Sequence, residues 1–283
     1  MGTINKNLVV IPQIYADIVR EKISSASRVA QFATNLGSIV NKEVGETINF
    51  PVWKYIGDAK DIAVGTPMTA VELAQKNSTA TIKMVAAPAV KVFDYDNMVA
   101  FGNALTEGAS QQALAIARKI DSDLILEAQG TNFKQQLATK DAMTESELLD
   151  ALGLFGDDRD TSTFAAIVIH SKLAKSFYLM DGFVKSTVTY VADANGKVVV
   201  NGVIGTYMGI PVVLTDKLYD TTNSEGYGFI LKKGALGYMP KELPLVETER
   251  TANIRATTVY ASQIYAVKMI DESGVVMFKN VVA

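Results

Sequence analysis

Two stretches of alternating hydrophobicity, separated by a long polar segment, constrain this chain more than any other feature. Thr47–Ile56 and Thr79–Val85 each carry apolar side chains at every second position, and a period of two predicts β-strands. The segment 57–78 between them is rich in Asp, Lys, Gly, Pro and Thr. A two-stranded ribbon is marginal in water unless another layer covers its apolar face. The sequence therefore predicts a ribbon that packs on something else.

Both faces of the predicted ribbon carry large apolar or aromatic side chains. Ile48, Phe50, Val52 and Ile56 share one face, and Asn49, Pro51, Trp53 and Tyr55 share the other. The chain offers little apolar surface nearby to cover both faces, so we expect an arm that packs on a neighbouring subunit. The ribbon residues expected to make this contact are Phe50, Trp53, Tyr55 and Ile56, although Trp53 fits a packed core position equally well.

The composition is that of a folded protein without a general attraction for nucleic acid. The 283 residues are 48% hydrophobic and 20% charged, with a net charge of −3 and a pI of about 5.4. This length is compatible with about two domains. Because cysteine is absent, disulfides and thiolate metal sites are excluded. No secretory signal and no run of about 18 apolar residues occurs, so we expect a soluble protein made inside the cell, without membrane contact.

The strongest helical pattern covers Thr106–Gln129. Small and aliphatic residues recur along it every three or four positions, the spacing of one helix face, and Gly130 is a typical stop. At 1.5 Å per residue such a helix is about 36 Å long, so we expect it to form the backbone of the subunit. A shorter amphipathic helix is expected over 12–22, with Ile14 and Ile18 at helical spacing.

The middle of the chain predicts a small α/β layer. Thr144 is placed to cap a helix over Glu145–Phe155 through a T-x-x-E pattern, Phe164–Ile169 is a buried strand, and Ser171 caps the next helix. Segment 133–142 is expected to be a polar connection. Strands are expected in a hairpin at Thr187–Val200 and at Ile210–Leu214, Tyr227–Lys232, Thr257–Ile270 and Val275–Lys279, the last closing a hairpin, with a turn at Gly234–Met239.

Residues typical of catalysis and metal binding are scarce. His170, the single histidine, ends an apolar strand; a polar residue at a strand-to-helix junction is a simpler interpretation than a general base. Asp157, Asp158 and Asp160 lie in a turn that lacks the calcium-loop pattern. Neither a phosphate-binding G-x-x-x-x-G-K-[ST] loop nor a G-x-S-x-G motif occurs. We therefore expect no catalytic residue, no cofactor and no metal.

Taken together, the layout resembles a tailed-phage major capsid protein of the Hong Kong 97 fold. The resemblance covers nearly the whole chain and consists of fold and assembly segments rather than a catalytic signature. It is most specific at NGVIGTYMGIPVVLTDK and ILKKGALGYM. The segments that carry it are Ile11–Lys22, Val44–Trp53, Ala115–Leu124, Asn201–Lys217, Ile230–Met239, Val246–Ala252 and Tyr265–Val276.

This resemblance implies an α+β capsid fold in four parts. Residues 1–43 correspond to an N-terminal arm, and 44–87 to an extended β-hairpin loop that lies over an adjacent subunit. Residues 88–143 and 241–283 correspond to a peripheral domain with a long spine helix, and 144–240 to an α/β axial domain. Further contacts between subunits are expected at Ile14 and Ile18 in the arm and at Glu247 and Arg250 near the end of the chain.

The function implied by the resemblance is structural rather than enzymatic. Such proteins self-assemble into pentamers and hexamers that close into an icosahedral head around double-stranded DNA, within the bacterial host cytoplasm. Expected partners are other copies of the chain, a separate scaffolding protein, because only eleven residues precede Pro12, and a portal. Contact with the packaged DNA is expected to be loose, and no covalent Lys–Asn crosslink is predicted.

Three other interpretations remain open from the sequence. An encapsulin-like compartment shares the fold but encloses protein cargo. A hydrolase would use His170 as its base. An accessory head protein, such as a decoration, would need another protein to build the shell.

Overall fold

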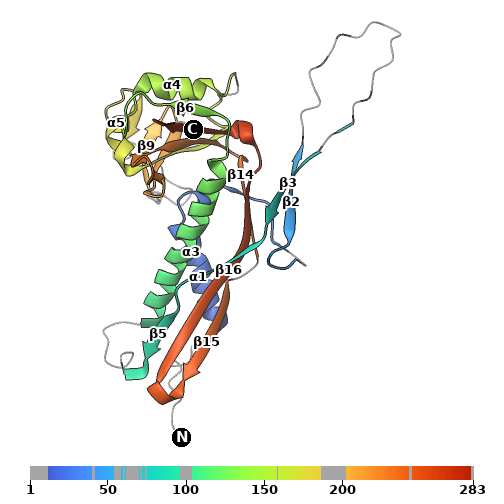
Figure 1. Cartoon of the computed structure of the whole chain (residues 1–283), viewed down its shortest axis with the longest axis vertical. Helices are drawn as coiled ribbons and strands as arrows, with labels where there is room; N and C mark the ends of the chain where they lie inside the picture. Colours follow the sequence, from blue (N-terminus) through green and yellow to red (C-terminus); the bar gives the residue numbers. More distant parts are fainter. Residues whose placement is uncertain are drawn as a thin grey trace.

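The computed structural model describes residues 12–39, 42–53, 75–95, 104–157, 159–185, 202–241 and 244–281, with a few isolated positions between 54 and 74. Within these residues the chain forms two large sheets, a small two-stranded sheet, a long helix and a projecting ribbon (Figure 1). The predicted hairpin at Thr187–Val200 lies outside the described residues. Among the described helices, none combines the length and apolar character needed to cross a lipid bilayer.

The long helix α3 (Ala104–Ala128) confirms the prediction from periodicity. Its buried face consists of small and aliphatic side chains, from Ala109 to Leu124, and these pack against β16 (Ala256–Met269). The pairing is fixed by polar contacts as well, because the Tyr265 hydroxyl donates to Asp123 Oδ2 at 2.9 Å. The first helix α1 (Pro12–Ala26) packs on α3, and the Tyr15 hydroxyl donates to Gln112 Oε1 at 2.7 Å.

Strand β16 is the axis of the first sheet, which we call the long sheet. One edge of β16 pairs with β14 (Leu236–Pro240) and β15 (Leu245–Thr251). The other edge pairs with β4 (Lys83–Ala86) and β5 (Val90–Phe93). The short strand β1 (Thr34–Asn35) pairs with β14 and so extends the sheet on the first edge. The expected turn at Gly234–Met239 is present only at its start, and it is wrong from Leu236 onward, where β14 pairs with β16.

The second sheet, which we call the compact sheet, has seven described strands around the fully buried β7 (Phe164–Ile169). The helices α4 (Glu145–Gly153) and α5 (Ala174–Tyr178) contribute to its core. In order across the sheet, the strands are β6 (Lys134–Gln136), β17 (Val275–Lys279), β13 (Gly228–Lys232), β7, β10 (Ile210–Leu214), β9 (Val203–Tyr207) and β8 (Phe183–Lys185).

Two expectations about the compact sheet are corrected. Strand β17 pairs with β13 and β6 rather than closing a hairpin with β16. The connection at 133–142 contains strand β6, which lies parallel to β17. Sheet membership therefore divides the segment 241–283 between the two sheets, and it places β14 with the long sheet.

Local signals explain where several elements begin. Thr144 and Glu147 form the predicted capping box, in which Glu147 Oε2 accepts from the Thr144 amide at 2.7 Å. After β7 the chain makes a one-turn helix η3 (Ser171–Leu173) before α5. The remaining short elements are η2 (Ala30–Phe32), β11 (Tyr219–Asp220), β12 (Glu225–Gly226), η4 (Ala252–Ile254) and η5 (Glu272–Gly274).

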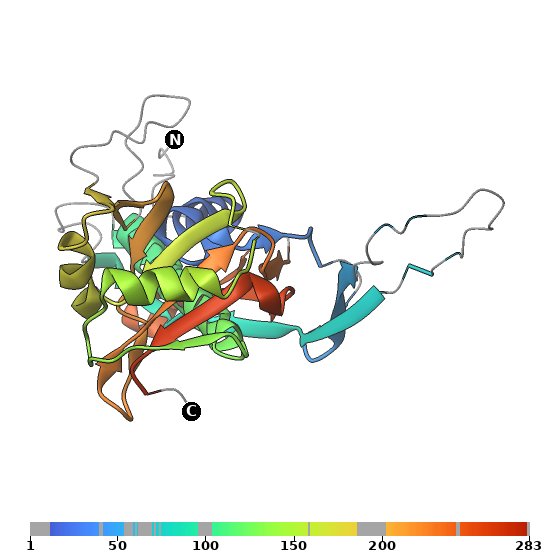
Figure 2. The ribbon, with the colours of Figure 1, turned by 90° about the horizontal axis from the view of Figure 1, so that it is seen from above.

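The predicted ribbon is present as β2 (Thr47–Trp53) and β3 (Gln75–Thr81). The strands pair residue by residue from Thr47 opposite Thr81 to Trp53 opposite Gln75, so the second strand begins before the expected Thr79. Seen from above, the ribbon leaves the side of the molecule and points away from both sheets (Figure 2).

Candidate assembly surfaces

The base of the ribbon is anchored inside its own subunit. The Phe50 side chain is fully buried in a small core with Ile39, Ala80, Ile82 and Ala266. Burying a phenylalanine in this way is worth about 2 kcal/mol. The prediction that Phe50 contacts a neighbouring subunit is therefore wrong, because the chain's own long sheet covers it.

The absence of a side chain at Gly237 makes room for this anchor. A Cβ atom at this position of β14 would come within 2.9 Å of Phe50 Cδ1 and 2.6 Å of Ile270 Cδ1. Real Cβ atoms do not approach so closely, so a larger residue would push the ring of Phe50 out of its site. The fold therefore provides a specific site for the Phe50 side chain, and Gly237 is needed to keep that site open.

Of the other ribbon residues predicted to make contacts, Trp53 lies in β2, opposite Gln75. Its side chain, and the residues Tyr55 and Ile56, lie outside the described part of the structure. The predicted contacts at these three positions remain predictions.

Part of one face of the long sheet is uncovered in the single subunit. In β16, Val259, Ala261 and Tyr265 point toward α3 and are buried. Alternate residues point to the opposite face. There the ribbon base covers Ile264 and Ala266, but nothing in the described chain covers the next part of that face.

The uncovered part, which we call the open face, carries large apolar side chains from four strands. Met84 and Leu245 are each 48% exposed, Tyr260 is 43% exposed and Phe93 is 41% exposed. The register places them on one side of the sheet, because Met84 pairs with Ile264, Leu245 with Ser262, and Phe93 with Ala256. Apolar side chains gathered on one face are typical of a protein interaction surface. The sequence reasoning missed these residues, although a strand at Thr257–Ile270 with apolar side chains on both faces was the signal for them.

The four remaining predicted contact residues differ in their exposure and in whether they already have a partner within the subunit. Ile14 is 55% exposed on α1, whereas Ile18 is half-buried against the main core. Glu247 is exposed on the open face, opposite Tyr260. Arg250 donates to both carboxylate oxygens of Asp94, at 2.7 and 2.6 Å, so its guanidinium is already paired within the subunit. The hydrogen bond from Arg250 lowers the pKa of Asp94.

The arm after α1 is held to the long helix by a single buried carboxylate. Asp121 accepts hydrogen bonds from the backbone amides of Arg28, Val29 and Ala30, at 2.9, 3.0 and 2.9 Å. Burial raises the pKa of Asp121, and the three amides act against this rise. We call this contact the Asp121 clasp. Beyond the clasp, the arm joins the long sheet, because Thr34 and Asn35 pair with β14.

His170 has the structural role that the simpler interpretation predicts. It is buried and caps η3, where its Nδ1 accepts from the Lys172 amide at 3.2 Å. The cap lies at His170 rather than at the expected Ser171. Within the described residues, no hydrogen bond joins the imidazole to a serine or carboxylate side chain, and no group of three or more acidic residues or histidines is placed to hold a metal ion.

The protonation of His170 is expected to weaken the fold. Desolvation lowers its pKa, Lys172 adds to the effect, and Asp216 and Asp141 oppose it. Because the folded pKa is below the unfolded value of about 6.5, stability is full above that pH and is lost as the pH falls toward the folded pKa. Denaturant unfolding at pH 7.5 and 5.5 checks this. We expect a greater loss for the natural chain than for His170→Asn, which keeps a capping oxygen but does not titrate. Equal losses in the two proteins would contradict the expectation.

Comparison with known proteins identifies the fold to which this structure belongs. No family model matches the chain. A curated relative, the major capsid protein of Staphylococcus phage phiMR11, is 25% identical over 267 residues, which cover 94% of this chain and 92% of the relative. Among solved structures, the capsid of cyanophage P-SCSP1u matches with a TM-score of 0.61 at 14% identity, covering 89% of this chain and 88% of that one. The chain has the Hong Kong 97 fold of tailed-phage capsid proteins.

Other capsid-fold structures support the same assignment. The capsid of a native GTA particle matches with a TM-score of 0.62 at 14% identity, over 92% of this chain and 91% of that one. A virus-like particle from Pyrococcus furiosus matches equally well, with a TM-score of 0.62 at 11% identity, over 96% of this chain and all of that one. The predicted α+β capsid fold is therefore confirmed.

Proposed function

We propose that this chain is the shell subunit of a tailed-phage head, which forms pentamers and hexamers that close around double-stranded DNA. The similarity to a phage major capsid protein along 94% of the chain supports the proposal. The observation that carries it is the ribbon, which is anchored by Phe50 at its base and points away from its own subunit. A projection of this kind has no use within one subunit and fits contact between copies.

We assign the parts of the subunit by analogy with the fold. The long sheet with α3 is the peripheral domain, and the compact sheet with α4 and α5 is the axial domain around the capsomer centre. Residues 12–39 belong to the N-terminal arm, and 44–87 to the extended loop. We change the limits predicted from the sequence at four strands, according to their pairing. Strands β6 and β17 go with the axial domain, and strands β4 and β14 go with the peripheral domain.

Assembly is driven by covering apolar surface on neighbouring copies. The open face exposes Met84, Phe93, Leu245 and Tyr260, and removing apolar surface from water contributes about 25 cal/mol per Å². Each contact is modest alone, but contacts closed into a shell reinforce one another because they form at high effective concentration. A separate scaffolding protein and a portal complete this assembly in our proposal, and the chain itself has no catalytic role.

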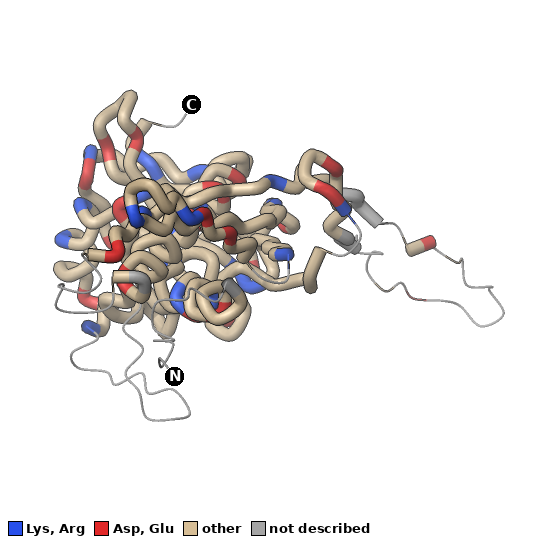
Figure 3. Tube along the Cα trace, turned by 90° about the horizontal axis from the view of Figure 1, so that it is seen from below, with Lys and Arg blue, Asp and Glu red and all other residues tan. Residues whose placement is uncertain are grey.

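The enclosed DNA is held loosely. The net charge is −3, and basic and acidic residues are interspersed along the described trace in Figure 3. A slightly acidic chain gives little of the counterion release that drives nonspecific DNA binding. Tight DNA binding by the free subunit at physiological salt would refute this part of the proposal.

A protein-filled compartment is the second candidate. The match to the Pyrococcus furiosus virus-like particle favours it, since that structure covers 96% of this chain. Both candidates predict closed shells from this fold, so the contents of the shell distinguish them.

The proposal is tested by expressing the full chain alone and together with a candidate scaffolding protein, and imaging the products by negative-stain electron microscopy. We expect closed particles, at least with the scaffold. Particles from phage-infected cells should contain nuclease-protected double-stranded DNA. Particles filled with a specific protein instead would favour the compartment, and a chain that only attaches to shells made by another protein would be an accessory head protein.

A charge placed on the open face should block assembly without unfolding the subunit. Met84→Lys with Leu245→Lys puts two cations where contact between copies would bury them, at a cost of several kcal/mol for each unpaired charge. Exposed substitutions of this kind change subunit stability by about 0.5 kcal/mol or less. Sedimentation should show subunits in place of shells, with an unchanged unfolding midpoint. The volume-conserving pair Met84→Leu and Leu245→Met is the control and should assemble; normal shells from the lysine pair would exclude the open face as a contact.

A further inference from the structure

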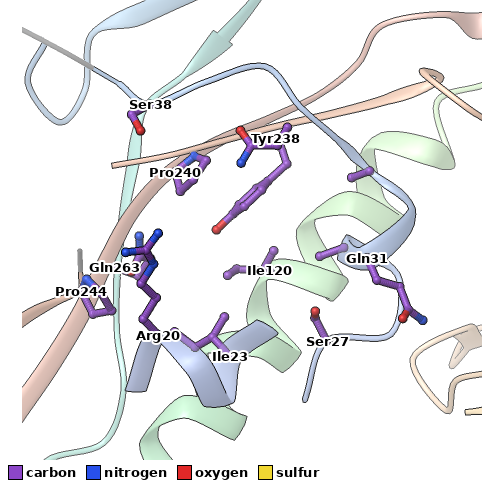
Figure 4. Close-up of a pocket in the computed structure, with 13 residues that line it drawn as sticks. Arg20, Ile23, Ser27, Gln31, Ser38, Ile120, Tyr238, Pro240, Pro244 and Gln263 are labelled. Atoms are coloured by element: carbon purple, nitrogen blue, oxygen red, sulfur yellow. The ribbon is translucent and has the colours of Figure 1, made fainter. Parts of the chain in front are cut away.

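A cavity of about 320 Å³ lies beneath the arm, at the place where the arm crosses from α1 to the long sheet (Figure 4). Its walls come from α1, the arm, α3, β14, β16 and Pro244 just before β15, so six parts of the chain meet around it. This volume is at the lower end of the range for small-ligand sites.

The walls of the cavity are held in place from both sides. The Asp121 clasp fixes the arm at residues 28–30. The pairing of Thr34 and Asn35 with β14 fixes it again, and the Leu36 amide donates to the Tyr238 carbonyl at 3.3 Å. The cavity is therefore formed by the fold itself rather than by a loosely placed strand.

The polar groups of the cavity are suited to an anion. Arg20 extends from α1 toward the cavity, and the Tyr238 ring directs its hydroxyl into it (Figure 4). Burial raises the pKa of Tyr238 to about 12, so the hydroxyl stays protonated and can donate. None of the lining residues is acidic. In the described part of the chain, no carboxylate forms an ion pair with Arg20, and the Tyr238 hydroxyl has no hydrogen-bond acceptor.

The rest of the lining mixes aliphatic and neutral polar side chains. Ile23, Ile120, Pro240 and Pro244 supply aliphatic surface for a stem. The neutral polar residues are Ser27, Gln31, Asn35, Ser38 and Gln263. A single guanidinium with a hydroxyl matches one carboxylate. A phosphate carries more negative charge than a carboxylate, and Arg20 is the one cation among the described lining residues to balance it.

We propose that this cavity binds a carboxylate on an aliphatic stem, held by Arg20 and Tyr238. The ligand is either a free carboxylic acid or a glutamate side chain presented by another polypeptide, and the two share the same chemistry. The site does not depend on the proposed shell function, and its test does not require assembly.

The test is calorimetric titration of the purified full-length chain with hexanoate, the neutral hexanamide, inorganic phosphate and a short peptide with glutamate between two aliphatic residues. We expect hexanoate or the glutamate peptide to bind, and hexanamide and the matching glutamine peptide to bind at least about tenfold more weakly, because a charge-assisted hydrogen bond is lost. Binding of the peptide alone would identify a protein segment as the ligand, and binding of hexanoate alone would identify a free acid.

Two variants locate the binding. Arg20→Gln should weaken it by about tenfold, and Tyr238→Phe, which removes only the hydroxyl, should weaken it severalfold. Arg118→Gln, which removes an exposed cation of α3 that does not line the cavity, is the matched control and should leave binding unchanged. The proposal is overturned if neither carboxylate ligand binds, if phosphate binds more tightly than both, or if binding is the same in Arg20→Gln and the natural chain.

Discussion

Replacing residues 54–74 with the dipeptide Asn-Gly is expected to abolish closed shells while leaving the subunit folded. The register of the ribbon allows the change, because Trp53 and Gln75 pair directly and Asn-Gly supplies the two-residue turn that such a pair needs. The anchor at Phe50, Ala80 and Ile82 is kept, so the remaining ribbon still packs on the long sheet. The variant loses the segment that, in our proposal, contacts a neighbouring copy.

Electron microscopy and sedimentation of the shortened chain, with and without a scaffolding protein, measure the loss of shells. Circular dichroism and the denaturant midpoint show whether the subunit is folded. A second variant, in which a Gly-Ser segment of equal length replaces 54–74, separates the contribution of length from that of sequence. Normal shells from the Asn-Gly chain would remove the ribbon from the assembly mechanism.

Removing the Asp121 carboxylate is expected to cause the largest loss of subunit stability. Asp121→Ala leaves three buried amides, those of Arg28, Val29 and Ala30, without their acceptor. Hydrogen bonds to a charged group contribute about 1.5–3 kcal/mol each and are not additive, so we expect a total loss of about 3–4 kcal/mol in the free energy of unfolding. Denaturant unfolding measures this loss, and limited proteolysis should show faster cleavage within residues 27–39.

The exposed Asp17 on α1 provides the matched control. Asp17→Ala removes an exposed carboxylate from α1, the helix that packs on α3, and does not remove an acceptor from the arm. Its stability should change by about 0.5 kcal/mol or less. Equal stability losses in the two variants would show that the clasp does not hold the arm.

Elements with a local signal were predicted correctly from the sequence. Helix α3 shows its buried face in the spacing of its own residues, and β7 is a continuous apolar run between turns. The capping box depends only on Thr144 and Glu147, which lie three residues apart. In each case the residues that determine the element are neighbours in the chain, so no knowledge of the tertiary structure was needed.

Errors occurred where the deciding partner is distant in the chain. Strand β6 has a polar sequence and forms because β17 offers it an edge, more than 100 residues away. A turn was expected over Gly234–Met239, yet β16 pairs with residues 236–240, and Phe50 occupies the space that Gly237 leaves. The burial of Phe50 could not be foreseen for the same reason. Phe50 packs against Ala266 of β16, and the alternating pattern of the ribbon strand does not indicate which other strand will cover it.

The passage from β16 to β17 has a consequence for how the subunit can change shape. Only residues 270–274 separate the strand at the centre of the long sheet from a strand inside the compact sheet, and Thr131 Oγ1 donates to the Val275 carbonyl at 2.7 Å just beyond α3. So short a link cannot stretch. A change in the angle between the two sheets must therefore be taken up by the backbone torsions of residues 270–274, together with those of the two other short links between them, 129–133 and 233–235.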